Sequence, residues 1–522
     1  MNPADTSEIA PVLELLHQCQ EEAGYLREAD IEAAAAAAGV SPSEMYGAIS
    51  AYPRFRLEPG PSTTAVCTGP ACLMNGARDM FSGDAETHCL GLCDQPVAAL
   101  TPEGPGILQP GAAPVPPAIL PPVIGVPGSA FFGGDDPLAA ARTALGTPPA
   151  GLIAAVGDSG LQGRGGAGFP AGRKWEMVRA APGERKFVVC NLDESEPGTF
   201  KDRYILDHQP RRLLAGMIIG AHAVGASHGV IYIRYEYQQQ RERLLAEIDA
   251  LRAEGLLGET FDIVVRRAAG LYVCGEESAL LNSLEGKRPI PRDRPPYPTD
   301  AGLFGCPTLI QNAETLAAVP AIIARGAAWY RDAGSPKLYC VSGDVASPGV
   351  FELPLGTTAR DLLERAGSVD VKAFTLGGLS GGLLPPSALD VRLDFEDPRR
   401  YGAALGSGAV IPLGPSRCVV RFALEGMRFF AGESCGKCFP CRIGTTRLRE
   451  RLEHLSRGSG SGQTPANGVA EMPDIIDVLH TGSACGLGPA AGTLAKHLLA
   501  FFHDEVEEHA MGHCPAEECD NI

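Results

Sequence analysis

Cysteine is the residue type whose spacing points most directly to chemistry in this sequence. The chain has 16 cysteines, and three of them, in SCGKCFPCR, form a C-x2-C-x2-C pattern. Three closely spaced thiolates with one remote cysteine are typical of a [4Fe–4S] cluster. The alternative, a tetrahedral zinc, normally uses two separated C-x2-C pairs. We therefore predict a [4Fe–4S] cluster, with GSACGLG supplying the remote ligand, at Cys435, Cys438, Cys441 and Cys485.

A second group of cysteines lies near the N-terminus as two pairs. Cys67 and Cys72 have C-x4-C spacing, and Cys89 and Cys93 have C-x3-C spacing. Two pairs of thiolates suit a [2Fe–2S] cluster, in which each pair holds one iron. The alternative is a degenerate domain that keeps its cysteines and binds nothing. Zinc fits less well, because C-x2-C pairs are its usual form.

Four other cysteines give weaker signals. Cys514 and Cys519 in the tail have C-x4-C spacing, but no second pair is nearby, so we leave them unassigned. Cys190 and Cys274 lie in apolar surroundings and are interpreted as buried packing residues rather than nucleophiles.

A glycine-rich stretch, GLQGRGGAGFPAGRKW at residues 160–175, is the second kind of candidate site. Glycine allows φ > 0 and lets a flat or phosphorylated ligand approach the backbone closely. Arg164, Arg173 and Lys174 supply the positive charge that a phosphate site requires. No GK[ST] follows at the Walker A spacing. The alternative interpretation is a flexible glycine loop with no ligand.

Two further motifs favour the ligand site. CNLDESEPGTFKDR spans Cys190 to Arg203, and YVCGEE, followed by SLEG, spans Tyr272 to Glu277. Together with GRGGAGFP, they resemble the NADH-oxidising flavoprotein family over roughly residues 148–499. Its members include the flavin subunit of respiratory complex I, the diaphorase subunit of NAD-reducing hydrogenases and the beta subunit of NAD-dependent formate dehydrogenases.

The resemblance implies a joint site for FMN and NAD(H). Phe169 is expected to stack on the adenine, and Glu196 and Glu277 to hydrogen-bond the nicotinamide nucleotide; the alternative for Glu196 is a solvated acid. No residue acts as general acid, general base or nucleophile, because the protein supplies placement and electrostatics. The residues expected to contact FMN are Gly163, Arg164, Gly165, Gly166, Lys174, Asn191, Asp193, Tyr272, Gly275, Glu276 and Asn312.

Two positions depart from the family pattern. The family usually has Asn-Asn before Val-Glu-Thr, whereas this chain has Gln311 and Asn312 before Ala-Glu-Thr. We expect Gln311 to reach the ribityl chain less surely than asparagine would. Arg294 stands where complex I homologues tend to have a lysine near the nicotinamide nucleotide, which keeps the positive charge but changes the geometry.

The N-terminal region is expected to be helical from Ile9 to Tyr52, because its apolar residues recur at helical spacing and an alanine run covers residues 33–38. SPSEMYGAISAYPRF, starting at Ser41, resembles the beginning of the thioredoxin-like complex I subunit that carries a [2Fe–2S] cluster. The stretch between the two cysteine pairs is shorter here than in that subunit. We therefore predict a truncated thioredoxin-like domain.

The predicted fold class is multidomain α/β. Strand-like runs alternate with helical segments from about residue 137, which indicates a mainly parallel sheet with the ligand at the strand C-termini. A β-grasp (SLBB-like) domain and a helical iron–sulfur domain follow, and residues 456–470 are expected to form a surface loop. The predicted boundaries are thioredoxin-like 1–103, Pro/Gly-rich linker 104–128, FMN/NADH domain 129–336, β-grasp domain 337–420, and helical [4Fe–4S] domain with tail 421–522.

Charge and composition exclude several classes of function. The net charge is −18, which argues against nucleic acid or an anionic membrane as a direct partner. The N-terminus is not that of a signal peptide, and no apolar run reaches the ~20 residues of a membrane span. Many clustered cysteines without a secretory signal favour metal ligation in a reducing compartment. We expect a cytoplasmic protein.

The expected function is electron exchange between NAD(H), FMN and iron–sulfur clusters. The N-terminal fusion, Arg294 and Gln311 favour the beta subunit of an NAD-dependent formate dehydrogenase, in which formate is oxidised or CO2 reduced on a molybdenum- or tungsten-containing partner chain. That chain and a small thioredoxin-like [2Fe–2S] subunit are the expected partners. The alternatives are a hydrogenase diaphorase, a complex I flavin subunit, and a non-catalytic relay or scaffold subunit.

Overall fold

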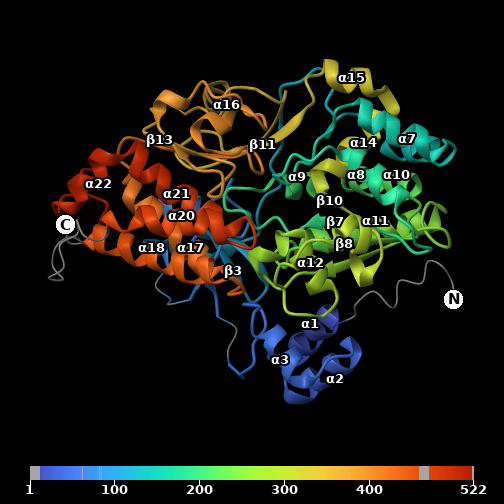
Figure 1. Ribbon diagram of the computed structural model, residues 1–522, viewed down its shortest axis with the longest axis horizontal. Helices are drawn as coiled ribbons and strands as arrows, with labels where there is room; N and C mark the ends of the chain where they lie inside the picture. Colours follow the sequence, from blue (N-terminus) through green and yellow to red (C-terminus); the bar gives the residue numbers. More distant parts are fainter. Residues whose placement is uncertain are drawn as a thin grey trace.

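The computed structural model describes residues 12–60, 63–81, 83, 85–368, 370–457 and 469–519. Four parts of the fold are visible in Figure 1: N-terminal helices at the bottom, an α/β part, a β-rich part at the top and a helical part that contains the C-terminus. This arrangement confirms the predicted fold class. Within the described ranges, no helix is long and apolar enough to cross a membrane.

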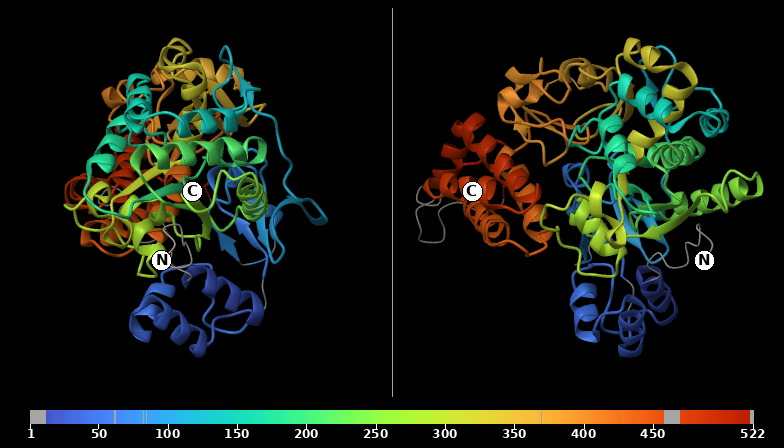
Figure 2. Two further views of the ribbon diagram at one scale, coloured as in Figure 1. Left: turned by 90° about the vertical axis from the view of Figure 1, so that its right-hand side faces the viewer. Right: turned by 45° about the vertical axis from the view of Figure 1, so that its right-hand side comes forward.

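The first three helices confirm the helical prediction from Val12 onward; residues 9–11 lie outside the described part. They are α1 (Val12–Ala23), α2 (Glu28–Ala38) and α3 (Pro42–Ile49). α3 begins with Pro42 and a capping box, in which the Ser41 hydroxyl accepts from Glu44 N and the Glu44 carboxylate accepts from Ser41 N. Leu13 and Leu16 share a core with Val189. These helices therefore pack on the sheet of the α/β part (Figure 2).

The cysteine pairs near the N-terminus lie in and beside a five-stranded sheet with the order β2-β1-β3-β4-β5. The short helices α4 (Pro70–Met74) and α5 (Ala77–Met80) lie between its first two strands. The strands are β1 (Ala65–Cys67), β2 (Glu86–Thr87), β3 (Ala98–Thr101), β4 (Gly104–Gln109) and β5 (Ala112–Val115).

The linker predicted at residues 104–128 needs correction. Its first half forms β4 and β5, an antiparallel pair joined by a turn in which Gly111 has φ +70°. Proline is compatible with such a hairpin, because Pro110 precedes the turn glycine and Pro114 lies on an edge strand. Farther along, β6 (Val123–Ile124) joins the edge of a different sheet. Proline-rich composition therefore concealed three strands.

The α/β part contains a fully parallel sheet with the order β10-β7-β8-β9. Its strands are β7 (Phe187–Leu192), β8 (His228–Ile233), β9 (Asp262–Arg267) and β10 (Thr308–Asn312). Side chains alternate between the two faces. Val188 and Cys190 pack with the helices of one face, whereas Phe187 and Val189 pack with the N-terminal helices. Burial on both faces explains why these strands read as continuous apolar runs.

Helices cover this parallel sheet. α10 and α14 pack closely together on one face, and α12 belongs to the core on the other. The helices of this part are α6 (Pro137–Leu145), α7 (Pro149–Asp158), α8 (Ala171–Ala180), α9 (Lys201–His208), α10 (Pro210–Val224), α11 (Gln238–Ala253), α12 (Glu277–Leu284), α13 (Pro298–Ala301), α14 (Ala313–Arg325) and α15 (Ala327–Asp332).

The β-rich part is a six-stranded mixed sheet with the order β14-β13-β15-β11-β12-β6. One helix, α16 (Ala359–Arg365), packs with it in a separate apolar core. Its strands after β6 are β11 (Lys337–Val341), β12 (Gly349–Leu353), β13 (Ala373–Leu376), β14 (Leu383–Leu384) and β15 (Ala409–Leu413).

The last part is a helical bundle with its own core. The segment predicted to be a surface loop, 456–470, falls mainly on residues 458–468, which lie outside the described part; Ser456 and Arg457 still belong to the preceding helix. The helices are α17 (Val419–Gly432), α18 (Phe439–Arg457), α20 (Met472–Gly482), α21 (Leu487–Phe501) and α22 (His503–Ala510).

Candidate functional site

A large cleft lies at the C-terminal ends of β7 and β10, where parallel α/β sheets commonly bind ligands. The two strands end side by side, with Asn191 paired in register with Asn312. The cleft has a volume of about 590 Å³. Its lining includes most of the predicted flavin and nucleotide residues, namely Gly163, Gly165, Phe169, Lys174, Asn191, Gly275, Glu276, Glu277, Arg294, Gln311 and Asn312.

The glycine loop forms one wall of this cleft, between α7 and α8. The Gly163 amide donates to the carbonyl of Phe169 over 2.9 Å, which closes the loop. Gly168 has φ +66°, and a Cβ atom there would lie 2.8 Å from the ring of Phe395. A Cβ on Gly165 would lie 3.2 Å from Asn312 Cβ. Side chains are therefore excluded where a flat ligand would lie against the backbone.

The side chain of Arg164 does not face the cleft, which corrects its expected contact with the FMN phosphate. It is 1% exposed, and its guanidinium donates to Tyr330 Oη at 2.9 Å and to the Ser335 carbonyl at 3.0 Å. Its backbone amide donates to Thr315 Oγ1. In this position the arginine anchors the glycine loop to the segment after α15. Lys174 is the basic side chain of the loop region that lines the cleft.

Four charged side chains form a network at the cleft. Lys174 Nζ lies 3.3 Å from Glu277 Oε2, and Arg294 Nη2 lies 3.1 Å from Glu277 Oε1. Arg294 also pairs with Glu276. The other oxygen of Glu276 accepts from the amides of Ser278 and Ala279 and so caps α12. The cleft thus presents two carboxylates whose positions are fixed by two cations and a helix N-terminus.

The polar residues at the strand ends hold the cleft floor. Asn191 Nδ2 donates to the Gly275 carbonyl at 2.8 Å, and Asn312 Nδ2 donates to Asp202 Oδ2 at 2.7 Å. Gln311 lines the cleft as expected. Asp193 lies behind the floor, where burial raises its pKa to about 7. Its Oδ2 is buried and makes no hydrogen bond within the described structure.

Glu196 and Tyr272 lie apart from the lining of the cleft. The Tyr272 hydroxyl donates to Glu196 Oε2 at 2.6 Å, and the Ser380 amide donates to Glu196 Oε1 at 3.0 Å. Burial raises the pKa of Glu196 to about 7. In the structure the carboxyl group joins the α/β part to the β-rich part, which the sequence motif alone did not indicate.

Two apolar side chains of the cleft were missed in the sequence. Met177 is 37% exposed and Tyr297 is 50% exposed, and both line the cleft together with Phe169, which is 41% exposed. Exposed large apolar side chains around a cleft suit an aromatic ligand. Met177 follows Lys174 by three residues on α8, so helical spacing was the available signal.

The four C-terminal cysteines meet as predicted. Cys435 and Cys438 lie in the loop after α17, Cys441 lies in the first turn of α18, and Cys485 lies just before α21. All four line one small cavity of about 10 Å³. Burial, with a contribution from neighbouring cysteines, raises the pKa of Cys441 and Cys485 to about 11. Iron would replace these protons on binding, so the donor set fits a [4Fe–4S] cluster.

The four N-terminal cysteines also meet. Cys89 Sγ lies 3.2 Å from Cys93 Sγ, and Cys67 interacts with both Cys72 and Cys89. A Cβ on Gly69 would lie 3.2 Å from Cys89 Sγ and 3.4 Å from Cys67 Sγ. Four convergent thiols beside a glycine amide suit a [2Fe–2S] cluster.

Comparison with protein families gives four matching regions. Residues 156–321 match the Nuo51 FMN-binding domain, and residues 421–509 match the iron–sulfur binding region of NADH-ubiquinone oxidoreductase-F. Residues 4–85 match the thioredoxin-like [2Fe–2S] ferredoxin, and residues 338–371 match the SLBB domain. The matches confirm the expected kinds of domain.

The identity to individual relatives shows which family the chain belongs to. The F 2 subunit of NADH-quinone oxidoreductase of Rhizobium meliloti is 43% identical over 72% of this chain and 93% of its own length. The chain belongs to the family of NADH-quinone oxidoreductase F subunits. The NADP-reducing hydrogenase subunit HndC of Solidesulfovibrio fructosivorans is 38% identical over 71% of this chain and 78% of its own length.

A solved structure resembles almost the whole chain. A chain of the NAD+-reducing [NiFe]-hydrogenase in the H2-reduced state superposes with a TM-score of 0.88 at 32% identity, over 97% of this chain and 94% of its own length. Because 97% of the chain is covered, the likeness includes nearly all of the N-terminal region.

Membership of this family makes the protein an oxidoreductase that uses NAD(H), FMN and iron–sulfur clusters. The structure also places cysteines that lie outside the matched family regions. The [2Fe–2S] match ends at residue 85, and the fold brings Cys89 and Cys93 to the first cysteine pair. Cys418, Cys514 and Cys519 lie outside the iron–sulfur match at 421–509.

Proposed function

We propose that the chain is the diaphorase subunit of an NAD(H)-linked enzyme complex, and that the cleft exchanges a hydride between NAD(H) and FMN. Bound FMN supplies the conversion between a hydride and single electrons, and the clusters carry those electrons. The observation that carries the proposal is the position of the cleft. Gly275 and Glu276 line the cleft, and Val273, two residues before Gly275, lines the cavity of Cys435.

The proposed roles of the residues follow from their positions. The glycine loop and Lys174 hold the FMN phosphate and ring, with Asn191, Gln311 and Asn312 at the floor. Phe169, with Met177 and Tyr297, offers apolar surface for the adenine. Glu277 and Arg294 fix the ribose side of the nucleotide. A carboxylate there would also repel the 2′-phosphate of NADP.

Glu196 and Tyr272 are proposed to act at the boundary of the cleft. Tyr272 packs edge-on against Phe429 of α17, with ring centroids 5.1 Å apart. Phe429, Tyr272 and Cys89 line one cavity, so the same aromatic pair lies beside the N-terminal cysteine group. Glu196 then orients Tyr272 rather than forming part of the lining of the nucleotide site. Its expected hydrogen bond to NADH requires the side chain to leave Tyr272.

Steady-state kinetics of the full chain, purified anaerobically, test this proposal. NADH–ferricyanide activity of the isolated chain would contradict the relay or scaffold alternative. Glu277→Gln should raise KM for NADH about tenfold, because the carboxylate that accepts ribose hydroxyls is lost. Flavin content should stay unchanged. Glu259→Gln, at an exposed position remote from the cleft, is the matched control. An unchanged KM in Glu277→Gln would contradict the nucleotide assignment.

The partner chain is the second part of the proposal. Arg294 and Gln311 support the beta subunit of a formate dehydrogenase with a molybdenum or tungsten partner and a small [2Fe–2S] subunit. The N-terminal fusion does not separate the two alternatives, because the likeness to the hydrogenase chain includes it. The hydrogenase alternative is favoured by one observation, the likeness of 97% of the chain to a chain of an NAD+-reducing [NiFe]-hydrogenase. Metal analysis of the intact complex separates them. Molybdenum or tungsten with formate-dependent NAD+ reduction supports the first, and nickel with hydrogen-dependent reduction supports the second.

A further inference from the structure

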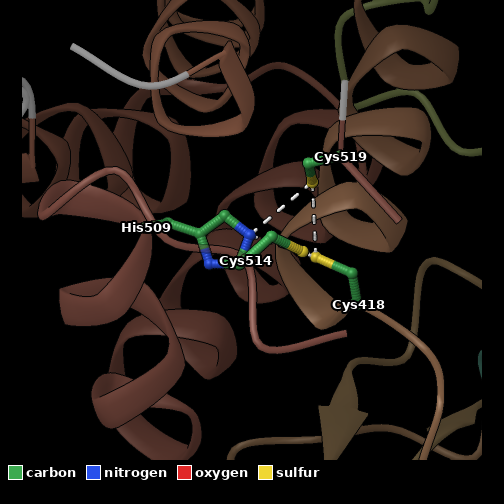
Figure 3. A group of neighbouring side chains, drawn as sticks. All are labelled: Cys418, His509, Cys514 and Cys519. Atoms are coloured by element: carbon green, nitrogen blue, oxygen red, sulfur yellow. Dashed lines mark hydrogen bonds between the residues drawn. The ribbon is translucent and has the colours of Figure 1, made fainter. Parts of the chain in front are cut away.

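Four side chains outside the flavin cleft and both predicted clusters converge in the C-terminal part of the molecule. They are Cys418, His509, Cys514 and Cys519, and their ligand atoms all lie within 4.8 Å of one another (Figure 3). Cys418 precedes α17, His509 lies in α22, and the other two lie in the segment after α22. We propose that these residues bind one structural zinc ion.

The distances between the ligand atoms suit a single tetrahedral ion. Cys418 Sγ lies 3.3 Å from His509 Nε2 and 3.6 Å from Cys519 Sγ. Cys519 Sγ lies 3.6 Å from His509 Nε2. With zinc bond lengths of about 2.3 Å to sulfur and about 2.0 Å to nitrogen, a tetrahedron places two sulfurs roughly 3.8 Å apart and a sulfur and a nitrogen roughly 3.6 Å apart. The side chains are already close to this geometry.

The imidazole is oriented as a ligand. His509 Nδ1 lies 2.7 Å from the carbonyl oxygen of Glu505. A carbonyl oxygen only accepts, so Nδ1 carries a proton and Nε2 is the nitrogen left to bind a metal ion. Nε2 is the atom that points toward the cysteines (Figure 3). Metal-bound histidines are typically held by a hydrogen bond of this kind from their second nitrogen.

The donor set favours zinc over an iron–sulfur cluster. A [2Fe–2S] cluster has two metal centres and separates its ligand pairs, whereas these four ligand atoms surround one point. Three thiolates and one imidazole make a closed, fully protein-ligated set, which is typical of structural zinc. The site is also buried: Cys418 is 1%, His509 0% and Cys514 4% exposed. A catalytic metal would need an open position, which this set does not leave.

Hydrogen bonds and ion pairs hold Cys418 and the C-terminal segment in place. Its Sγ accepts from the Arg421 amide at 3.3 Å, in the first turn of α17. Its own amide donates to Glu518 Oε2 at 2.8 Å, next to Cys519. Arg417 pairs with both Glu518 and Asp344. These contacts tie the C-terminal segment to the point where β15 passes into α17.

The proposed ion would therefore fix the joint between the β-rich part and the helical part. Glu505 accepts from the Val419 amide at 2.9 Å and pairs with Lys372 at 2.6 Å. α22 and the residues after it thus contact both parts at the start of α17. Zinc would hold this contact together by binding the residue before α17, the last turn of α22 and the segment after α22.

Metal analysis of the full chain, prepared without a metal-binding tag and dialysed against EDTA, tests the proposal. We expect one zinc per chain in addition to the iron. Cys519→Ser should lose that zinc but keep the iron and flavin. Loss of the ion should lower the midpoint of thermal unfolding by several degrees. The variant should still fold, because Cys519 is the most exposed of the four ligands. Cys19→Ser, which changes a thiol in α1, is the control and should keep the zinc.

X-ray absorption at the zinc edge gives an independent answer, including the case in which the variant fails to fold. Three sulfurs at about 2.3 Å and one nitrogen at about 2.0 Å support the site. Zinc retained at full content in Cys519→Ser, oxygen-only ligation, or a mononuclear iron in place of zinc would each overturn the proposal. A disulfide between Cys418 and Cys519, found by mass spectrometry of the unreduced protein, would overturn it as well.

Discussion

The two predicted cluster sites are enclosed very differently. The N-terminal cysteines Cys67, Cys72, Cys89 and Cys93 are all 2–4% exposed. In the C-terminal group only Cys441 is buried, at 5%, and the other three are partly exposed. Both groups include loop residues, but the loop that carries Cys89 and Cys93 is packed into the core of the α/β part, whereas the loops that carry Cys435, Cys438 and Cys485 are partly exposed.

The difference also concerns which core each group belongs to. Cys89 and Cys93 share the main core of the α/β part with Trp175 and Phe200. Asp94, directly after Cys93, accepts a hydrogen bond from Arg203 at 2.6 Å. Cys441 instead belongs to the core of the helical bundle. Cys67 and Cys72 belong to the small core of the five-stranded sheet, so the N-terminal group lies where that sheet packs against the α/β part.

The largest expected effect is in the C-terminal group. Cys438→Ala should abolish the EPR signal of the [4Fe–4S] cluster in NADH-reduced protein, because a missing thiolate leaves one iron without its protein ligand. The [2Fe–2S] signal should remain. Cys306→Ser, a change at a cysteine outside both groups, is the control. An unchanged [4Fe–4S] spectrum in Cys438→Ala would contradict the ligand assignment.

Cys93→Ser should have the next largest effect. We expect loss of the [2Fe–2S] signal with the [4Fe–4S] signal retained. Because Cys93 lies in the core of the α/β part, the midpoint of thermal unfolding should also fall by several degrees. EPR and calorimetry of the same preparation measure both effects. If the wild-type protein shows a [4Fe–4S] signal but no [2Fe–2S] signal, the N-terminal domain keeps its cysteines without binding a cluster.

Chelation sharpens the comparison further. In EDTA with ferricyanide, the [4Fe–4S] cluster should be lost roughly ten times faster than the [2Fe–2S] cluster, because the [4Fe–4S] ligands are partly exposed. The two decays can be followed separately by EPR. Equal rates would mean that local opening, rather than static exposure, controls access to both groups.

The smallest expected effect concerns Glu196, which lies with Tyr272 between the two groups. Its folded pKa of about 7 is above the ordinary value of 4.5. Between these pH values the unfolded chain loses a proton that the native carboxyl keeps, so the free energy of unfolding falls as pH rises. Glu196→Gln removes this penalty. Relative to wild type, the variant should gain on the order of 1–2 kcal/mol between pH 5 and pH 8.

Thermal unfolding at the two pH values measures this gain. Glu259→Gln, which alters an exposed carboxylate, should show no such pH dependence. If Glu196→Gln changes the unfolding midpoint equally at both pH values, the native carboxyl titrates like an exposed one and is not buried beside Tyr272.

Much of the fold could be predicted because its signals are local. Continuous apolar runs marked β7 and β8, and the glycine loop and cysteine spacings marked the sites. The direction of Arg164 could not be predicted, because its partners Tyr330 and Ser335 are more than 160 residues away in sequence. The proline-rich composition also gave a wrong prediction at residues 104–128. There β4 and β5 form a local hairpin and β6 pairs with the distant β12, although proline favours extended linkers.

The proposed zinc site could not be predicted from the sequence either. Cys514 and Cys519 formed half a site in the sequence. Cys418 and His509 complete it only through the packing of α22 against the start of α17. No spacing rule could join Cys418 to Cys519, because 101 residues separate them.

The pairing of β6 with β12 has a consequence for synthesis. Val123 and Ile124 leave the ribosome 225 residues before Gly349, the first residue of their partner strand. At 5–20 residues per second this is a wait of roughly 10 to 45 seconds. During that time the β6 backbone is an unpaired edge, and the prolines beside it, Pro121 and Pro122, hinder pairing with other nascent chains. The β-rich part closes only after β15 has been synthesised, because β15 joins β11 to β13.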